Sequence, residues 1–276
     1  MFGYQVLGFG AGGLPTPEVE YLVVAGGGGS TDAGGGAGGY RTNFPGGTLM
    51  VLERGTPFPI TVGTGTTHPS TRGGNSSMVG DFTIDCTGGG RGGPSPNQPW
   101  DPPPWSDKVA YPGGSGGGAA QAGPQAGGGG GNAGSYDPPE GSGGGQNYPP
   151  GTGTSSGGAG GGGAAQGGSP SPALTPTGGE GGNGSPNTIS GADVTYAGGG
   201  GAVSGGGTYS GAPGTGGGPT GVGGGGKGGA GGDGTVILRG PASTSFTVSP
   251  GTNTTSTAPG GEQIATFTVS GTVVAG

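Results

Sequence analysis

The chain holds one histidine and one cysteine, the residue types that most often supply a base, a soft metal ligand or a nucleophile. His68 lies in a polar run of Thr, Pro and Ser, and Cys86 has no second sulfur with which to share a metal. Zinc sites take three or four protein ligands, so we predict no metal site and interpret His68 as a solvated loop residue. The acidic residues are too dispersed to form the carboxylate pair that cleaves glycosides.

One motif has the spacing of a nucleotide-binding loop. Residues 221–227 match the glycine-rich phosphate loop up to its lysine, Lys227, but Gly228 stands where Ser or Thr would hold magnesium. The chain has 87 glycines, so such a match, like any GxGxxG, arises from composition alone. We therefore predict no cofactor and no enzyme activity.

Charge and hydropathy exclude two classes of partner. The formal net charge is -7, and the seven Lys and Arg residues are scattered singly, which predicts no nucleic-acid binding. No apolar run approaches the roughly 20 residues of a membrane helix, so we predict no membrane insertion. The start lacks the basic region of a secretory signal, which favours synthesis in a cytosol and release by another route, such as lysis.

Aromatic residues are the strongest candidates for a contact site. Trp100 and Trp105 lie in the proline-rich stretch 94–112, which proline keeps from forming a helix or a central strand. They either cap the open end of the glycine-rich region or, with Tyr111, form an exposed platform for a sugar or a protein. Further tyrosines, which we interpret with nearby prolines as turns and candidate contacts, are Tyr136, Tyr148, Tyr196 and Tyr209.

The first residues alternate aromatic and other side chains. This pattern predicts either a loose arm or a docking peptide that adds to the sheet edge or apolar groove of a partner. The docking candidates are Phe2, Tyr4, Leu7 and Phe9.

The tract 113–234 is so rich in glycine that few side chains remain to bury. Three states suit it: a solvated linker, a collagen triple helix, or polyglycine II helices packed side by side. Collagen needs glycine at every third position, and the spacing here drifts. We adopt the third state, in which main chains without Cβ atoms approach closely enough to bond to one another.

Conventional strands flank this tract. Residues 18–25 and 233–239 are rich in β-branched residues, and we predict that 21–24 pair with the second segment. We also predict a hairpin of 47–52 and 58–62 with a turn at 53–56, and one strand over 77–84. These strands should form the only conventional core, from Leu49, Val51, Ile60, Val62, Phe82 and Ile84.

The tail holds two further strand candidates, 244–249 and 264–274. They form a separate β-module, or complete the first sheet, or join the sheet of a neighbouring subunit. The predicted organisation is a docking arm (1–17), a glycine-rich domain (18–240) and a C-terminal β segment (241–276). The predicted fold class is mainly β and irregular, with short antiparallel strands clamping a polyglycine II bundle and few or no α-helices.

Four segments, 19–29, 35–41, 60–63 and 232–239, resemble the glycine-rich domain of bacteriophage tail-fibre and other virion proteins. The resemblance covers roughly residues 18–240. In that family a segment similar to 264–273 commonly precedes the first strand; its place at the far end here suggests circular permutation or strand exchange between subunits. Some adhesins of this kind stack polyglycine II helices and bind host surfaces through the connecting loops.

The resemblance implies a virion structural protein, made in the host cytoplasm, that serves as a tail-fibre or fibre-tip component and binds the host surface through loops. The alternative is a capsid-decorating or connector protein with a purely structural role. Composition alone also suits an ice-binding or matrix protein. The expected partners are other virion proteins, a homo-oligomer such as a trimer, and a glycan or protein of the host surface.

Overall fold

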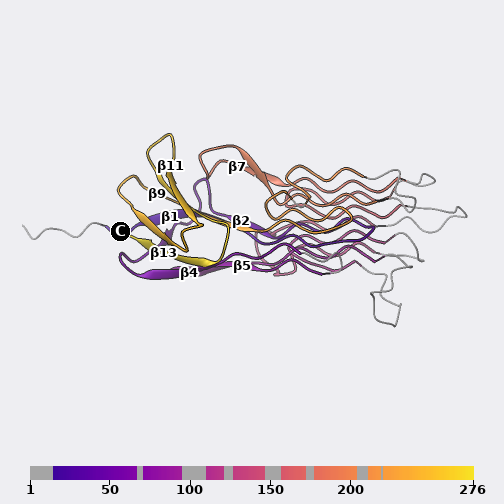
Figure 1. Ribbon diagram of the computed structural model, residues 1–276, viewed down its shortest axis with the longest axis horizontal. Coiled ribbons are helices and arrows are strands. Elements are labelled where there is room, and N and C mark those ends of the chain that lie inside the picture. Colours follow the sequence, from indigo (N-terminus) through magenta and orange to yellow (C-terminus); the bar gives the residue numbers. More distant parts are fainter. Residues whose placement is uncertain are drawn as a thin grey trace, which may run out of the picture.

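The computed structural model describes residues 15–66, 71–94, 110–120, 127–146, 157–171, 177–203, 211–218 and 220–276. The molecule is elongated, with β-sheets at one end and a body of extended glycine-rich segments running side by side at the other (Figure 1). Within the described ranges there is no helix, and every strand pair is antiparallel. The predicted class, mainly β and irregular, is confirmed at this level.

Three sheets contain all the strands of the described chain. The first has the order β11-β12-β9-β1-β2, with β3 paired to the start of β1; the second has the order β10-β13-β4-β5-β6; β7 and β8 form a small hairpin. The strands are β1 (Glu18–Val24), β2 (Tyr40–Thr42), β3 (Met50–Val51), β4 (Pro57–Thr61), β5 (Ser76–Val79), β6 (Thr83–Cys86), β7 (Ser185–Asn187), β8 (Val194–Tyr196), β9 (Thr235–Gly240), β10 (Phe246–Ser249), β11 (Thr254–Thr257), β12 (Gln263–Phe267) and β13 (Gly271–Ala275).

Strand β1 pairs with three strands of the first sheet, β2, β3 and β9, and both of its faces are buried along most of its length. It pairs with β9 in the register Leu22↔Ile237, which confirms the predicted pairing. The face that carries Val19 and Val23 packs on the second sheet and forms one core cluster. Leu22, on the opposite face, joins a second cluster that includes residues near β7 and β8. The prediction of a single conventional core is therefore wrong.

The predicted hairpin of 47–52 and 58–62 is wrong, although its turn is present. The N–H of Thr56 donates to the carbonyl of Glu53 at 3.2 Å. After this turn the chain passes from one sheet to the other, since β3 pairs with β1 while β4 pairs with β13 and β5. The N–H of Gly55 donates to Ala275 rather than to β3, so the turn is held by the end of the chain.

The strand predicted over 77–84 is instead the hairpin of β5 and β6, with Met78 opposite Ile84. The chain reverses at Gly80, whose N–H donates to the carbonyl of Phe82 at 2.9 Å. A side chain on Gly80 would collide with Met50 of β3, so the glycine makes room for a core residue.

Four of the six predicted core residues contact the core. Ile60, Val62 and Ile84 are buried, and half-buried Phe82 packs against the same cluster. The prediction that Leu49 is a core residue is wrong, because 37% of its surface is exposed. Val51 is only half-buried and is likewise not part of this cluster. The alternation around β3 has the opposite phase to the prediction, so Met50 and Leu52 are the residues that are fully buried.

The tail completes both sheets rather than forming a separate module. β12 pairs with β9 and β13 pairs with β4, so the predicted strand over 264–274 is broken where the chain crosses between sheets. The break is fixed by Asn253, whose Oδ1 accepts the N–H groups of Thr268 and Val269 at 3.1 and 3.2 Å.

The glycine-rich body is held by backbone hydrogen bonds between segments far apart in sequence. Segment 34–39 is at its centre. Successive N–H groups of this segment donate to three different neighbouring segments in turn, returning to the same neighbour at every third residue. The six N···O distances are 2.8–3.0 Å, and the pairs are Gly34 to Ala159 and Ala37 to Gly162, Gly35 to Gly226 and Gly38 to Gly223, and Gly36 to Gly90 and Gly39 to Thr87.

The carbonyl groups of the same segment face three further neighbours. They accept from the N–H groups of Gly118 and Ser115, of Gly200, and of Gly28 and Ala25. Segment 34–39 is therefore surrounded by six segments and has no exposed residue. Its glycines are required by this closeness: a Cβ on Gly34, Gly35, Gly36 or Gly38 would lie within 3.0 Å of a neighbour's carbonyl oxygen, nearer than real Cβ contacts come.

Candidate functional site

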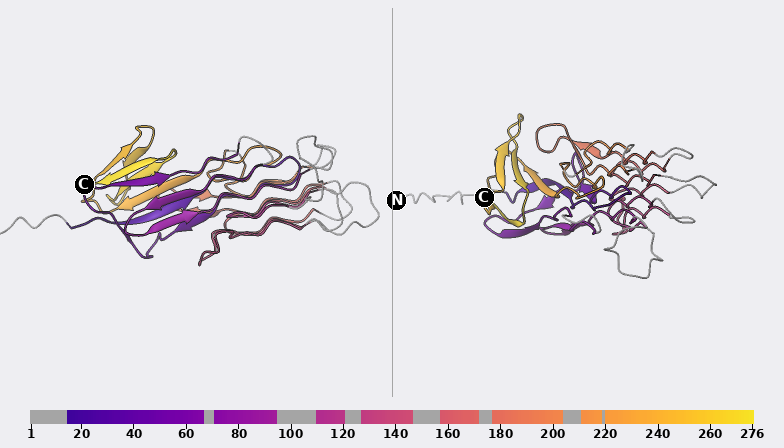
Figure 2. Two further views of the ribbon diagram at one scale, coloured as in Figure 1. Left: turned by 90° about the horizontal axis from the view of Figure 1, so that it is seen from below. Right: turned by 45° about the vertical axis from the view of Figure 1, so that its right-hand side comes forward.

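Several described segments of the glycine-rich body end on the side away from the sheets (Figure 2). Residues on this side bond to one another across segments: the N–H groups of Gly29, Gly93 and Gly211 donate to the carbonyl groups of Thr71, Gly118 and Ala202, respectively. The described segments end together on this side in all views (Figure 2). In sequence, the ends of these segments flank the stretches 67–70, 95–109, 121–126, 147–156, 172–176 and 204–210, which lie outside the described residues.

Several predicted site residues belong to the stretches outside the described residues. These are Trp100, Trp105, Tyr148 and Tyr209 among the contact candidates, His68, and the docking candidates Phe2, Tyr4, Leu7 and Phe9.

Tyr111 lies in the body, where its carbonyl accepts the N–H of Gly117, and it follows the stretch 95–109 in sequence. Its half-buried ring has the guanidinium carbons of Arg91 and Arg72 at 4.3 and 5.2 Å from its centroid. Its N–H donates to the carbonyl of Arg91 at 3.1 Å. Cation–π contacts of this kind stabilise by about 0.5–1 kcal/mol at exposed sites, so the ring is held in place at the root of the tryptophan-containing stretch.

Tyr136 lies elsewhere, where the body meets the sheets. It belongs to a turn in which Asn132 both accepts from and donates to its backbone, which confirms the predicted turn. Arg41 of β2 stacks on its ring at 4.1 Å. The structure therefore does not bring Tyr136 and Tyr111 into one site.

Tyr196 is not available as a contact residue. It ends β8 with 3% of its surface exposed and belongs to the second core cluster. Burial raises the pKa of its phenol, which fits a structural role. Its interpretation as an exposed tip is wrong because the preceding Val194 and Thr195 form a strand that carries it inward.

A buried carboxylate at the same junction was missed by the sequence analysis. Glu140 is 1% exposed, and its two oxygens accept the N–H groups of Thr87 and Gly134 at 2.8 and 3.0 Å. Its own carbonyl accepts the N–H of Tyr40 at 2.8 Å. Glu140 thus joins the turn at 132–140 to β2 and to the chain just after β6, and its role is structural.

Cys86 lies beside Glu140 and is buried, with its Sγ donating to the carbonyl of Val23 at 3.2 Å. Burial, and then the charge of Glu140, raise the pKa of the thiol well above its ordinary value. The reactive thiolate is therefore suppressed in the folded protein.

We expect Cys86 to resist a thiol reagent such as 5,5′-dithiobis(2-nitrobenzoate) at pH 8 until the protein unfolds. The check is the time course of labelling in buffer and in denaturant. Rapid stoichiometric labelling of the folded chain would contradict the burial of Cys86.

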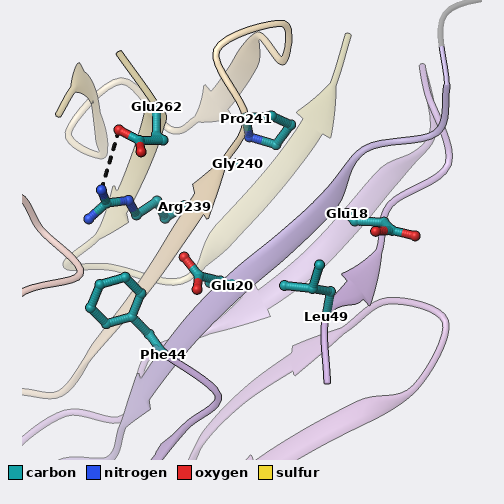
Figure 3. A pocket seen from close by; sticks show the side chains of 8 residues that line it. All are labelled: Glu18, Glu20, Phe44, Leu49, Arg239, Gly240, Pro241 and Glu262. Atoms are coloured by element: carbon teal, nitrogen blue, oxygen red, sulfur yellow. Dashed lines mark ion pairs between the residues drawn. The ribbon is translucent and has the colours of Figure 1, made fainter. Parts of the chain in front are cut away.

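A groove of about 530 Å³ lies on the outer face of the first sheet, near the end that is far from the body. Figure 3 shows Glu18 and Glu20 extending from β1 beside Leu49, with Arg239 and Glu262 across the groove. Phe44, Gly240 and Pro241 complete the lining. Arg239 and Glu262 form an ion pair at 3.3 Å. A hydrogen bond to its own backbone, and after it the charge of Arg239, lower the pKa of Glu262.

Comparison of the chain with known proteins identifies no family. No protein-family model matches the chain, and neither the curated proteins nor the solved structures contain a significant match. In the described ranges, no helix is long and apolar enough to cross a membrane, and no three His, Cys, Asp or Glu side chains are grouped to hold a metal. The resemblance to phage glycine-rich domains stays a prediction.

Proposed function

We propose that the glycine-rich body is a bundle of polyglycine II helices. Such a helix has three residues per turn and no internal hydrogen bonds, so its main-chain groups point to three directions in succession. The return of segment 34–39 to the same neighbour at every third residue supports this interpretation. So does the requirement for glycine where neighbouring main chains approach most closely.

We further propose that the protein is a structural component of a phage virion, at the tail fibre or fibre tip, that contacts the host surface through its loops. The observation that carries this proposal is that described segments of the body end together on the side away from the sheets, where their hydrogen-bonded ends flank six stretches of the sequence. A body bonded through its main chain can hold variable loops without a side-chain core beneath them. Two of these stretches carry Trp100, Trp105 and Tyr148, residue types enriched at contact hot spots.

The test is adsorption of the fluorescently labelled chain to a panel of bacterial cells. We expect a chain with Trp100→Ser and Trp105→Ser to lose most of its adsorption to a responsive strain while its Tm stays unchanged. Val269→Ser, at an exposed position between β12 and β13, is the matched control and should retain both properties.

If the protein is instead a capsid-decorating or connector protein, the double tryptophan variant should show a lower Tm and unchanged adsorption. If the double variant adsorbs as well as the parent while its Tm falls, the tryptophans cap the body and the adhesin proposal is wrong. Location of the chain on an intact particle would then decide between the decorating and connecting roles.

A further inference from the structure

The groove on the first sheet carries an unbalanced negative charge. Arg239 is already occupied, since it pairs with Glu262 and lies 5.1 Å from the centroid of the Phe44 ring. Within the described part of the chain, neither Glu18 nor Glu20 forms an ion pair; Glu20 only accepts a 3.4 Å hydrogen bond from the N–H of Gly46. Arg239 also lies directly opposite Glu20 in the pairing of β1 with β9, so the three carboxylates of the groove share one guanidinium. The groove therefore keeps a net negative charge beside an apolar surface.

The spacing of these carboxylates matches an extended peptide. Glu18 and Glu20 are two residues apart on β1, on the face opposite to buried Val19 and Tyr21. Alternate residues of a strand lie about 7 Å apart on one face. Leu49, one of two large hydrophobic residues exposed in the described chain, lies beside both carboxylates, where it can contact the aliphatic stems of basic side chains.

We propose that this groove binds an extended segment of another protein that carries Lys or Arg at two alternate positions, followed by an aliphatic residue on the same face. The two cations would lie over Glu18 and Glu20, and the aliphatic residue would contact Leu49 or Phe44. This inference does not depend on the virion proposal, because it concerns the opposite end of the molecule and a different kind of ligand.

A second copy of the chain does not fit this description. Its seven Lys and Arg residues, at positions 41, 54, 72, 91, 108, 227 and 239, are never two apart. Four of these residues also lie over aromatic rings of their own chain, namely Arg41, Arg72, Arg91 and Arg239. Charge complementarity therefore favours a partner of different sequence.

The probe is the peptide acetyl-Lys-Thr-Lys-Thr-Leu-amide, titrated into the full chain and followed by NMR at the amides of β1 and β9. A peptide of the same composition with adjacent lysines, acetyl-Lys-Lys-Thr-Thr-Leu-amide, places its charges on opposite faces and should bind more weakly. Binding of the first peptide should weaken as the salt concentration rises, since exposed charges are screened.

The double variant Glu18→Gln and Glu20→Gln should bind the first peptide about threefold to tenfold more weakly, the effect expected of two exposed ion pairs. Glu180→Gln, exposed on the glycine-rich body, is the control with the same change in chemistry and should bind as the parent does. No binding by the parent, equal binding of the two peptides, or equal binding by the double variant would overturn the proposal. So would dimerisation of the chain that excludes the peptide.

Discussion

Replacement of Gly35 by alanine is expected to destabilise the protein by at least about 3 kcal/mol, or to prevent folding altogether. The added Cβ would collide with the carbonyl oxygen of Gly28 and the main-chain nitrogen of Gly226. Neither atom belongs to a flexible side chain, so the new methyl group must push apart segments that are bonded on all sides. In a chain of this size such a loss lowers Tm by roughly 6–12 °C.

The matched control is Gly229→Ala, in the same body. A Cβ at Gly229 would meet nothing within 4 Å, and its backbone does not lie in the left-handed region. Alanine there should be neutral or slightly stabilising, because it restricts the unfolded chain. The measurement is denaturant and thermal unfolding of both variants. Equal stability of Gly35→Ala and Gly229→Ala would refute the claim that main-chain approach holds the body together.

The difference between these two glycines explains why composition alone misjudges such a chain. In an ordinary domain glycine is a weak point, since it loses more backbone entropy than any other residue. Around segment 34–39 its missing side chain is what allows six neighbours to bond to one main chain. The loss of entropy is offset by the number of hydrogen bonds, and a single methyl group changes that balance.

The sequence predicted the conventional strands where β-branched residues are concentrated. β1 and β9 were found with their pairing because Leu22 and Ile237 lie in runs that favour strand and no other element. It failed at β3, where Leu49 to Leu52 are all apolar and no alternation shows which residues point inward. Only the pairing of Val19 with Met50 fixes that phase, and this is a tertiary contact.

The sequence of the body also carries a three-residue period that could have been used to predict its structure. In segment 177–183 the residues other than glycine recur at every third position, as Thr177, Glu180 and Asn183, and the last two are exposed. This is the pattern expected of an outer row in a threefold lattice, with polar residues facing water. The neighbours of each row could not be predicted, because the contacts are made by main-chain atoms that every glycine shares.

The candidate sites were predicted less well than the strands. Tyr111 and Tyr136 were singled out as aromatic residues near prolines, yet their rings pack against different arginines, Arg91 and Arg41. The contacts between these arginines and tyrosines could not be predicted, since the arginines are scattered singly in the sequence. The groove on the first sheet was likewise not predicted, because Glu18 and Glu20 look like any solvated strand edge until Leu49 is placed beside them.

Replacement of Glu140 is expected to cause the second large loss of stability. Replacement by alanine should destabilise the protein by about 3 kcal/mol, because it removes two hydrogen bonds to a charged acceptor and leaves the N–H groups of Thr87 and Gly134 without partners. Glu140→Gln keeps the shape and one acceptor oxygen, so we expect an intermediate loss. Denaturant unfolding measures the total effect, and hydrogen exchange at the amides of Thr87 and Gly134 locates it.

Glu180→Ala is the control for Glu140→Ala. Its side chain is exposed on an outer row, and its removal should change stability by no more than about 0.5 kcal/mol. If Glu140→Ala were as stable as Glu180→Ala, with exchange at Thr87 unchanged, the buried carboxylate would not hold the junction. The expected large difference between two glutamates of one chain would show that the body is joined to its sheets at a few polar contacts. The glycine-rich body would then be held by its attachment to the sheets at one end, as well as by the hydrogen bonds between its main chains.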